Sequence, residues 1–272
     1  MILLVASKLD TAAVNIAAHL LTSYEFEETA ETFRGNPVYA KRLNSGEEAK
    51  LIFIDEDSIN AQFITEFFTP SLVIFLSRHK SESGIPTLSV HTPGNLGEAT
   101  FGGIPRKVSI APASAMKEAL IEMLRCRDEM ELQYEVSYEC THHGPSLDVP
   151  AMFVELGSSM EQWRDVRAAE AVARASLAAA SAVRVYPTVL GIGGPHYNRK
   201  FTRMAVETDI AFGHMIPKYA VDVVDIDLLR QCIERTVEPV ERVILDWKGI
   251  RGSDKATLID MLDEVGLEFE RV

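Results

Sequence analysis

The sequence predicts an α/β fold in a single domain, with a mixed central sheet and helices on both of its faces. Two observations favour this fold class: short apolar runs recur along the chain, and helical patterns lie between many of them. The 272 residues also contain no internal repeat, no low-complexity linker and no sharp change in composition. One domain is therefore expected, and it is large enough to bury a substantial core.

Eight short runs are predicted to be β-strands. Several are apolar at consecutive positions, which is typical of strands buried on both faces of a sheet. The first run begins the chain and alternates as a strand does, with no basic segment before it. The predicted strands are residues 2–7, 50–55, 71–77, 87–92, 132–139, 151–157, 187–193 and 242–247.

Five segments repeat apolar residues at the spacing of an α-helix. The first begins at Asp10, a favourable N-cap residue. The longest is rich in alanine, and Ser158 and Glu161 match the S-x-x-E pattern of a capping box at its start. The predicted helices are residues 10–24, 114–130, 160–183, 225–236 and 254–266.

The composition is that of a globular protein, with 47% hydrophobic and 25% charged residues. No apolar run approaches the roughly 20 residues that cross a bilayer, so we expect a cytoplasmic protein without membrane contact. The net charge of −13 argues against a general nucleic-acid binder. Local basic faces remain open at residues 77–80, 104–107, 198–203 and 246–255.

Cysteine chemistry is not indicated. The three cysteines show no CxxC spacing and are odd in number, so a disulfide framework is not expected. Cys140 lies beside the histidine pair described next, but a small buried residue is the favoured interpretation.

Histidines are the unusual feature of this chain. His19 occupies an apolar-periodic position in the first predicted helix, and we interpret it as packing. The other six lie near glycine or proline, in stretches typical of strand-to-loop turns. Together with Glu155 at the end of a predicted strand, they exceed what packing requires. These six are His79, His91, His142, His143, His196 and His214.

Histidine and carboxylate are the usual protein ligands of catalytic zinc. Neither H-E-x-x-H nor H-x-E with C-x-x-C is present. In a regular strand, His142 and His143 would point to opposite faces, whereas the turn at Gly144 and Pro145 would let both face one ion. The alternative is that the two rings bond backbone groups and stiffen that turn.

Two further motifs suggest an anion-binding turn and a serine nucleophile. "GIGGPHYNRKFT" (191–202) places glycines before a basic segment, and exposed amides there would hold an anion and present His196 and Arg199. "ELGSS" (155–159) suggests a serine nucleophile, but the G-x-S-x-G pattern is missing and Ser158 is accounted for as a helix cap.

Taken together, several long motifs resemble one family. "THHGPSLDVPAMFVELGSSMEQW" (141–163), "GIGGPHYNRKFT" (191–202), "FGHMIPKYA" (212–220) and residues 71–95 are similar to the archaeal and plant type of D-aminoacyl-tRNA deacylase. The resemblance covers essentially the whole chain. One departure is Pro195, where a third glycine is expected before His196; proline has no N–H, which puts an anion-holding role for that amide in doubt.

The resemblance implies a zinc-associated hydrolase that cleaves the ester between a D-amino acid and the terminal ribose of tRNA, a reaction of translation quality control. It also implies a fold like nucleoside phosphorylases, with likeness to peptidyl-tRNA hydrolase. We expect a monomer without a stable protein partner. The catalytic candidates are His142, His143, Glu155 and His196. The metal candidates are His79, His91, His142, His143, Glu155 and His214, and the tRNA-binding candidates are Arg78, Lys80, Arg199 and Lys200.

Two rival functions stay open at this point. A phosphorylase or nucleosidase would use the glycine-rich turn with Arg78 or Arg199 to bind phosphate and would be indifferent to chelators. A non-catalytic module would bind metal or RNA without turnover. The strongly acidic chain lacks a stripe of aromatic and basic residues, so a pure RNA-binding module is the least favoured of the three.

Overall fold

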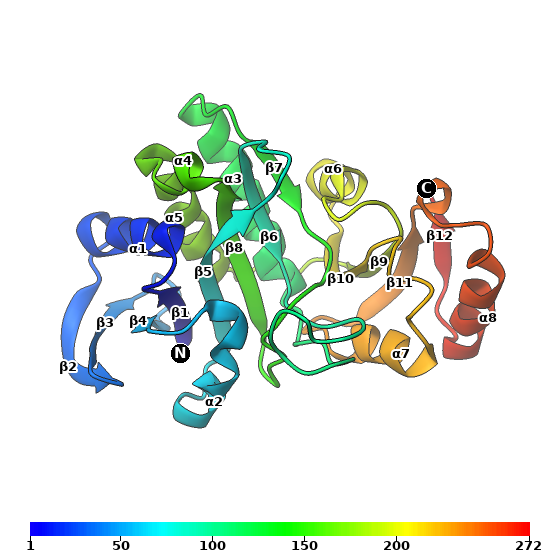
Figure 1. The fold of residues 1–272 in the computed structure, drawn as a ribbon, viewed down its shortest axis with the longest axis horizontal. Helices are drawn as coiled ribbons and strands as arrows, with labels where there is room; N and C mark the ends of the chain where they lie inside the picture. Colours follow the sequence, from blue (N-terminus) through cyan, green and yellow to red (C-terminus); the bar gives the residue numbers. More distant parts are fainter.

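A computed structural model describes residues 1–272 and contains two β-sheets side by side (Figure 1). The larger sheet has eight strands in the order β2-β3-β4-β1-β5-β8-β6-β7, and the smaller has four in the order β10-β9-β11-β12. Parallel and antiparallel neighbours both occur in the larger sheet. The predicted α/β class with a mixed sheet is confirmed, whereas sequence did not distinguish the second sheet.

All eight predicted strands are present, seven of them with shifted ends, and four more were not predicted. β2, for example, is polar and mostly exposed, so it lacks the apolar signal of a buried strand. The strands are β1 (Ile2–Ser7), β2 (Glu27–Phe33), β3 (Asn36–Arg42), β4 (Glu48–Ile54), β5 (Leu72–Lys80), β6 (Thr87–His91), β7 (Glu135–Tyr138), β8 (Ala151–Ser158), β9 (Thr188–Ile192), β10 (Ala211–Ile216), β11 (Val240–Leu245) and β12 (Phe269–Arg271).

The predicted helices are present except that the longest one is divided. Asp165 caps a new helix by accepting hydrogen bonds from the backbone N–H groups of Arg167 and Ala168, so the helix expected over residues 160–183 is wrong as a single element. The helices are α1 (Thr11–Ser23), α2 (Ile64–Phe67), α3 (Ala113–Glu129), α4 (Met160–Trp163), α5 (Val166–Ala180), α6 (Arg199–Glu207), α7 (Ile226–Glu234) and α8 (Lys255–Val265), with 3-10 turns η1 (Ser58–Phe63) and η2 (Trp247–Gly249).

The capping box before α4 lies one residue later than predicted. The backbone N–H and the hydroxyl of Ser159 donate to Oε1 of Gln162 at 3.1 and 2.7 Å. Ser158 instead ends β8, is buried, and donates its hydroxyl to the carbonyl oxygen of Ile85. A serine nucleophile is therefore disfavoured for a different reason, since the Ser158 hydroxyl is already engaged inside the protein.

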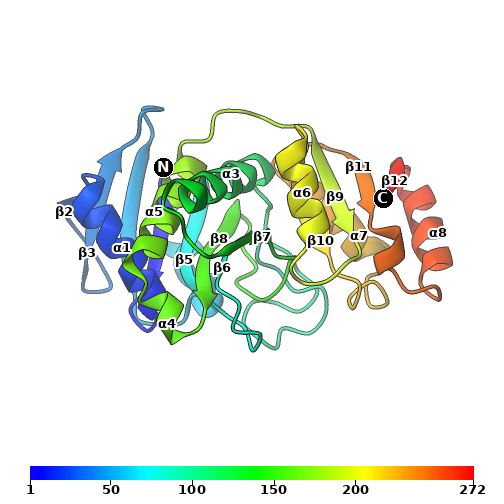
Figure 2. The same ribbon diagram turned by 90° about the horizontal axis from the view of Figure 1, so that it is seen from above.

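Helices cover both faces of each sheet. The largest apolar cluster lies between the larger sheet and α1, α3 and α5, and Figure 2 shows these three helices side by side. On the opposite face, η1 and α2 enclose a smaller cluster. In the smaller sheet α7 and α8 cover one face, while α6 and the end of α3 approach the other. No helix is long and apolar enough to span a membrane.

Strand register brings several functional candidates onto one face of the larger sheet. β5 and β8 are parallel, with Ser77 opposite Glu155 and His79 opposite Gly157. β6 runs antiparallel to β8, with His91 opposite Phe153. Because paired residues share a face and alternate residues repeat it, His79, His91 and Glu155 all project from the same side.

Candidate active site

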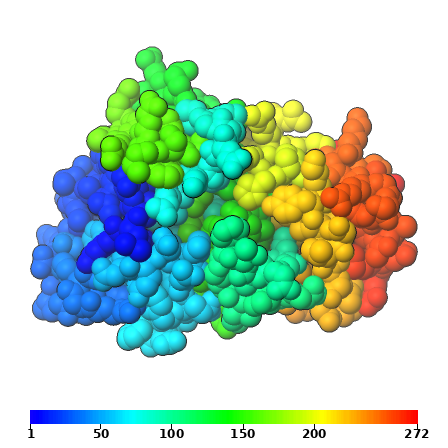
Figure 3. Space-filling model, viewed as in Figure 1, coloured from blue at the N-terminus to red at the C-terminus, as the bar shows by residue number.

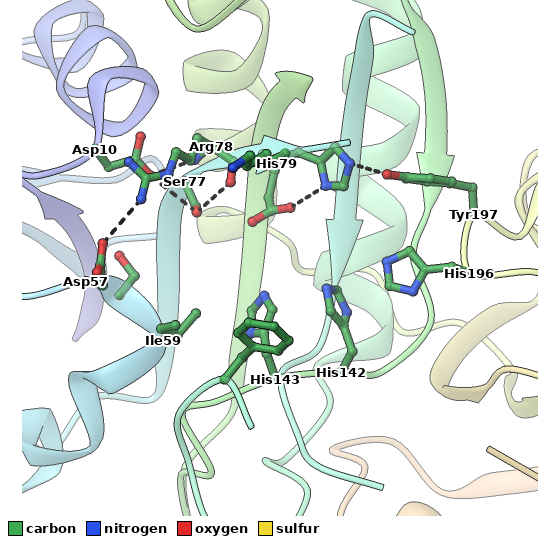
Figure 4. Close-up of a pocket in the computed structure, with 14 residues that line it drawn as sticks. Asp10, Asp57, Ile59, Ser77, Arg78, His79, His142, His143, His196 and Tyr197 are labelled. Atoms are coloured by element: carbon green, nitrogen blue, oxygen red, sulfur yellow. Dashed lines mark hydrogen bonds and ion pairs between the residues drawn. The ribbon is translucent and has the colours of Figure 1, made fainter. Parts of the chain in front are cut away.

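A cavity of about 630 Å³, which we call the basin, opens on that side of the larger sheet. It is the hollow near the middle of the face in Figure 3, and Figure 4 shows histidines from three segments turned toward it. Its lining includes His79, His142, His143, Glu155 and His196, which we call the basin residues. Five of the predicted site residues, far apart in sequence, therefore meet in one place.

His91 lies directly beneath the basin. Its ring is fully buried, stacks on Phe153 at 5.0 Å between centroids, and lies 4.3 and 4.9 Å from the rings of His142 and His143. Neither ring nitrogen of His91 has a hydrogen-bond partner, which is costly for a buried polar group. One nitrogen from each of these three histidines lies within 4.8 Å of the others, so the cluster could hold a metal ion.

Each of the adjacent histidines uses one ring nitrogen in a hydrogen bond and keeps the other free of one, with Nε2 of His142 lying 3.7 Å from Oε2 of Glu139. Nδ1 of His142 donates to the carbonyl oxygen of Cys140 at 2.8 Å, and Nδ1 of His143 donates to that of Gly144 at 2.7 Å. A carbonyl only accepts, so Nδ1 carries the proton and Nε2 keeps a lone pair. The rings thus brace the turn, as one of the two interpretations expected, and they also face the basin.

These three histidines are neutral at physiological pH. Desolvation, followed by the neighbouring His143, holds the pKa of His91 and of His142 well below the usual value. Burial also lowers the pKa of His143 to about 4. Neutral imidazole is the form that binds a metal ion, so the trio is in its ligating state without needing to release protons.

Glu139 links the histidines and was not predicted. Its carboxylate is fully buried; Oε2 accepts from Nε2 of His196 at 2.8 Å, and Oε1 lies 3.2 Å from Nδ1 of His79. Burial raises its pKa, but His79 and the hydrogen bond from His196 lower it further, to well below the usual value. Glu139 is therefore an anion at the centre of the cluster, where it also belongs to two groups that could hold a metal.

His79 and Glu155 carry opposite perturbations. Burial lowers the pKa of His79, but the Glu139 and Glu155 carboxylates raise it to about 11, so the ring is an imidazolium. Its Nδ1 lies 3.4 Å from Oε2 of Glu155, and Nε2 contacts the hydroxyl of Tyr197. Burial raises the pKa of Glu155 to about 7 despite the hydrogen bond from His79. Glu155 is thus poised to exchange a proton near neutral pH.

Gly157 makes room for His79 on the neighbouring strand. A Cβ added to Gly157 would lie 2.7 Å from Cβ of His79 and 2.8 Å from its Cδ2. The indole Nε1 of Trp163 donates to the carbonyl oxygen of His79 at 2.9 Å and fixes the backbone there. The end of β5 at His79 is therefore in contact with Gly157 on β8 and hydrogen-bonded to Trp163.

Replacing Gly157 with alanine is expected to displace the His79 ring and lower kcat about ten- to a hundred-fold, because small misplacements in a site are costly. Steady-state kinetics with the substrate that the sequence resemblance implies, a D-aminoacyl-tRNA, checks this. Gly252→Ala is the matched control, since a Cβ at Gly252 meets nothing within 4 Å. An unchanged kcat in Gly157→Ala would contradict the role given to the position of the His79 ring.

The glycine turn before His196 presents the ring of that residue to Glu139. The N–H of Gly193 donates to the carbonyl oxygen of Ile216 at 2.8 Å, so that amide is already used. The turn places His196 with Nε2 on Glu139 and with Nδ1 accepting from the hydroxyl of Tyr219 at 3.0 Å. Both nitrogens of His196 are thereby engaged.

His214 does not reach the basin. Its ring is fully buried on β10, with Nδ1 3.0 Å from the hydroxyl of Thr141 and Nε2 3.0 Å from the carbonyl oxygen of Arg235. Burial lowers its pKa to about 4. The structure thus gives His214 a bracing contact to the segment before His142 and groups it with no other metal-ligand candidates.

The four basic candidates are distributed around the basin. Arg78 and Lys80 line its rim; the Arg78 guanidinium pairs with Asp57 at 3.4 Å, whereas Lys80 is exposed and forms no salt bridge. Arg199 and Lys200 line an adjoining cavity that shares Tyr197 with the basin. Arg199 pairs with Glu135 at 2.7 Å, and Lys200 pairs with Asp246.

The residues that sequence reasoning missed are chiefly Glu139 and the tyrosines Tyr197 and Tyr219. Glu139 ends a predicted strand and stands three residues before His142, so a charge at the end of a buried strand was the available signal. The tyrosines carried no comparable signal. All three cysteines are free and buried.

Comparisons with known proteins bear on the whole chain. The family model described as D-aminoacyl-tRNA deacylase matches residues 66–270. A D-aminoacyl-tRNA deacylase of Thermococcus onnurineus is 39% identical over 98% of this chain and 98% of its own, and that of Pyrococcus furiosus is 40% identical with the same coverage.

Solved structures were compared as well. A crystal structure described as a conserved protein of unknown function superposes with a TM-score of 0.89 at 31% identity, covering 100% of this chain and 95% of the other. A 5′-methylthioadenosine/S-adenosyl homocysteine nucleosidase of Campylobacter jejuni gives a TM-score of 0.43 at 13% identity over 66% of this chain.

Proposed function

The chain belongs to the D-aminoacyl-tRNA deacylase family, and from this premise we propose that the basin is the place where it hydrolyses the ester of D-aminoacyl-tRNA. The enzyme is a hydrolase that releases the D-amino acid from tRNA, which serves chiral proofreading. The observation that carries the assignment is that one cavity is bordered both by a histidine trio able to hold a metal ion and by Glu155, whose pKa burial raises to about 7.

The histidine trio fits a zinc ion. The ring nitrogens of His91 are buried without partners, and Nε2 of His142 and Nε2 of His143 carry unshared lone pairs while their Nδ1 atoms are held by carbonyl groups. Three histidines and one open position form a known catalytic zinc site, and held Nδ1 atoms are its usual supporting contacts. When bound, zinc supplies a Lewis acid that polarises a carbonyl and lowers the pKa of water to about 7.

Glu155 is the proposed general base. Its carboxylate takes a proton from the attacking water as the water oxygen bonds to the ester carbonyl carbon. The bond from that carbon to the ribose oxygen then breaks, and the proton held on Glu155 passes to the ribose oxygen. The products are a free amino acid and a tRNA with its terminal hydroxyl restored.

The remaining basin residues, His79 and His196, orient the histidine trio and Glu155. The His79 imidazolium pairs with Glu155 and Glu139. Its contact with Glu155 lowers the pKa of that carboxyl and so opposes the rise caused by burial. His196, predicted as catalytic, anchors Glu139 between the two histidine groups. Both act through their neighbours because their ring nitrogens are occupied.

The basic side chains would receive the acceptor end of the tRNA. Lys80 is the first candidate for a phosphate contact because it lies at the rim without a salt bridge. Arg78 adjoins it, and Arg199 and Lys200 would extend the path into the adjoining cavity by exchanging Glu135 and Asp246 for phosphates.

Residues 1–272 are proposed to act as one domain and as a monomer in the cytoplasm, where charged tRNA is found. Support comes from the main apolar cluster, which includes residues of both sheets such as Val154, Val189 and Phe212. Calorimetry should show one unfolding transition, and light scattering should give a mass near 30.1 kDa. Two transitions or twice that mass would contradict the proposal.

The function is tested by charging one tRNA with D-tyrosine and, separately, with L-tyrosine. Purified protein should release the D-amino acid and leave the L-ester intact. Release of neither would sink the assignment, and nucleosides with phosphate would become the next substrates to try.

A further inference from the structure

A second cavity of about 500 Å³ meets the basin at the histidine pair. Phe101, His142 and His143 line both cavities, so the two spaces share one wall. The far side of the second cavity is formed by residues 217–223, including Tyr219, whose hydroxyl bonds Nδ1 of His196. Any group held there would adjoin the basin residues.

The two cavities differ in the charged groups that they offer. The basin is lined by Arg78 and Lys80 beside the carboxylates Asp10, Asp57 and Glu155, whereas the second cavity has no lysine or arginine in its lining and one carboxylate, Glu98. Glu98 is exposed and forms no salt bridge. In a charged tRNA every phosphate is anionic and the aminoacyl ammonium is the cationic group. Lys80, the basin cation without a salt bridge, therefore offers a contact to the phosphates of the acceptor end, and Glu98 offers one to the ammonium in the second cavity, which has no cation to repel it.

The second cavity is also lined by apolar surface that has no partner in the protein. Phe101 is 66% exposed, Tyr219 49% and Val223 49%, while Leu96 and Ala220 form a buried floor. Apolar lining with a few polar groups is typical of a small-molecule pocket, and burying a side chain there removes this surface from water.

We propose, on the basis of the function above, that the second cavity binds the side chain of the D-amino acid while its ester lies at the wall shared by Phe101, His142 and His143. The ester is fixed at the histidines, the ammonium turns toward Glu98, and the side chain enters the cavity. An amino acid of the opposite hand cannot satisfy all three at once.

The test narrows the cavity without touching the basin. Val223→Trp and, on the other side, Thr100→Trp place bulk at its exposed mouth. The same tRNA is charged with D-tyrosine and with D-alanine, and kcat/KM is measured for each. Val237→Trp is the matched control, because Val237 is similarly exposed, at 54%, and lines neither cavity.

Both variants should lower kcat/KM for the D-tyrosyl ester by about ten-fold or more, the usual scale of steric discrimination in an apolar pocket. The D-alanyl ester and inhibition by uncharged tRNA should change little. Equal losses for both esters with weaker inhibition by uncharged tRNA would place the acceptor nucleotide in the cavity and overturn the proposal. Unchanged kinetics for both esters would overturn it as well. If the wild-type protein releases neither ester, the proposed function itself fails.

Discussion

Replacing His143 with asparagine is expected to lower kcat/KM for a D-aminoacyl-tRNA by about a thousand-fold or more, since an electrophile in a site contributes several kcal/mol. Asparagine suits the test because His143 has a φ of 42°, a left-handed conformation that asparagine tolerates better than alanine. The fold should therefore persist while one of the three proposed metal ligands is removed.

His142→Ala should show a loss of the same order, because His142 belongs to the same group of three ring nitrogens as His91 and His143. The metal content of each purified variant, measured by elemental analysis, should fall together with activity. His19→Ala is the matched control, since His19 lies on α1 outside the basin. A variant that loses its metal but keeps full activity would contradict the proposal that these three histidines hold the catalytic metal. So would a variant that keeps its metal but loses activity.

Replacing Glu155 with glutamine is expected to lower kcat about 10²- to 10⁴-fold, the usual contribution of a general base. Glutamine keeps the shape of the side chain but cannot take up the proton. His91, His142 and His143 are unchanged, so zinc content should stay near that of the wild type. The expected zinc content thus distinguishes Glu155→Gln from the His142 and His143 variants, which should lose metal.

The pH profile gives an independent signature of Glu155. Burial raises its pKa to about 7, and the ionised carboxylate is the form that accepts a proton. Activity should therefore fall as pH drops through about 7, and Glu155→Gln should lack this limb. A wild-type kcat/KM that is flat between pH 5 and 8, or a fully active Glu155→Gln, would assign the base elsewhere.

Elements with a strong local signal could be predicted from sequence. β1, β5 and β8 are long apolar runs, and α1 begins at Asp10, which accepts from two backbone N–H groups as an N-cap should. β10 was missed because "AFGHMI" contains a glycine and a histidine that weaken the strand pattern. The division of α4 from α5 was missed because no glycine or proline marks the break at Asp165.

The site could be predicted in its residue types but not in its grouping. Five of the six histidines near glycine or proline, all except His214, lie in or directly beneath the basin. The register between β5, β6 and β8, which places His91 under the histidine pair and His79 beside Glu155, is a tertiary property that local spacing does not contain. For the same reason His214 was expected among the ligands although its ring lies between Thr141 and Arg235.

Metal removal and return tests the central claim most directly. Release of D-tyrosine from D-tyrosyl-tRNA is followed with the purified protein, with the chelated and dialysed protein, and with that protein after zinc is added back. The metal-free protein should lose about a thousand-fold or more in rate, and zinc should restore it. Undiminished cleavage of the D-ester by fully metal-free protein would contradict the account and leave Glu155 and the histidines to act without an ion.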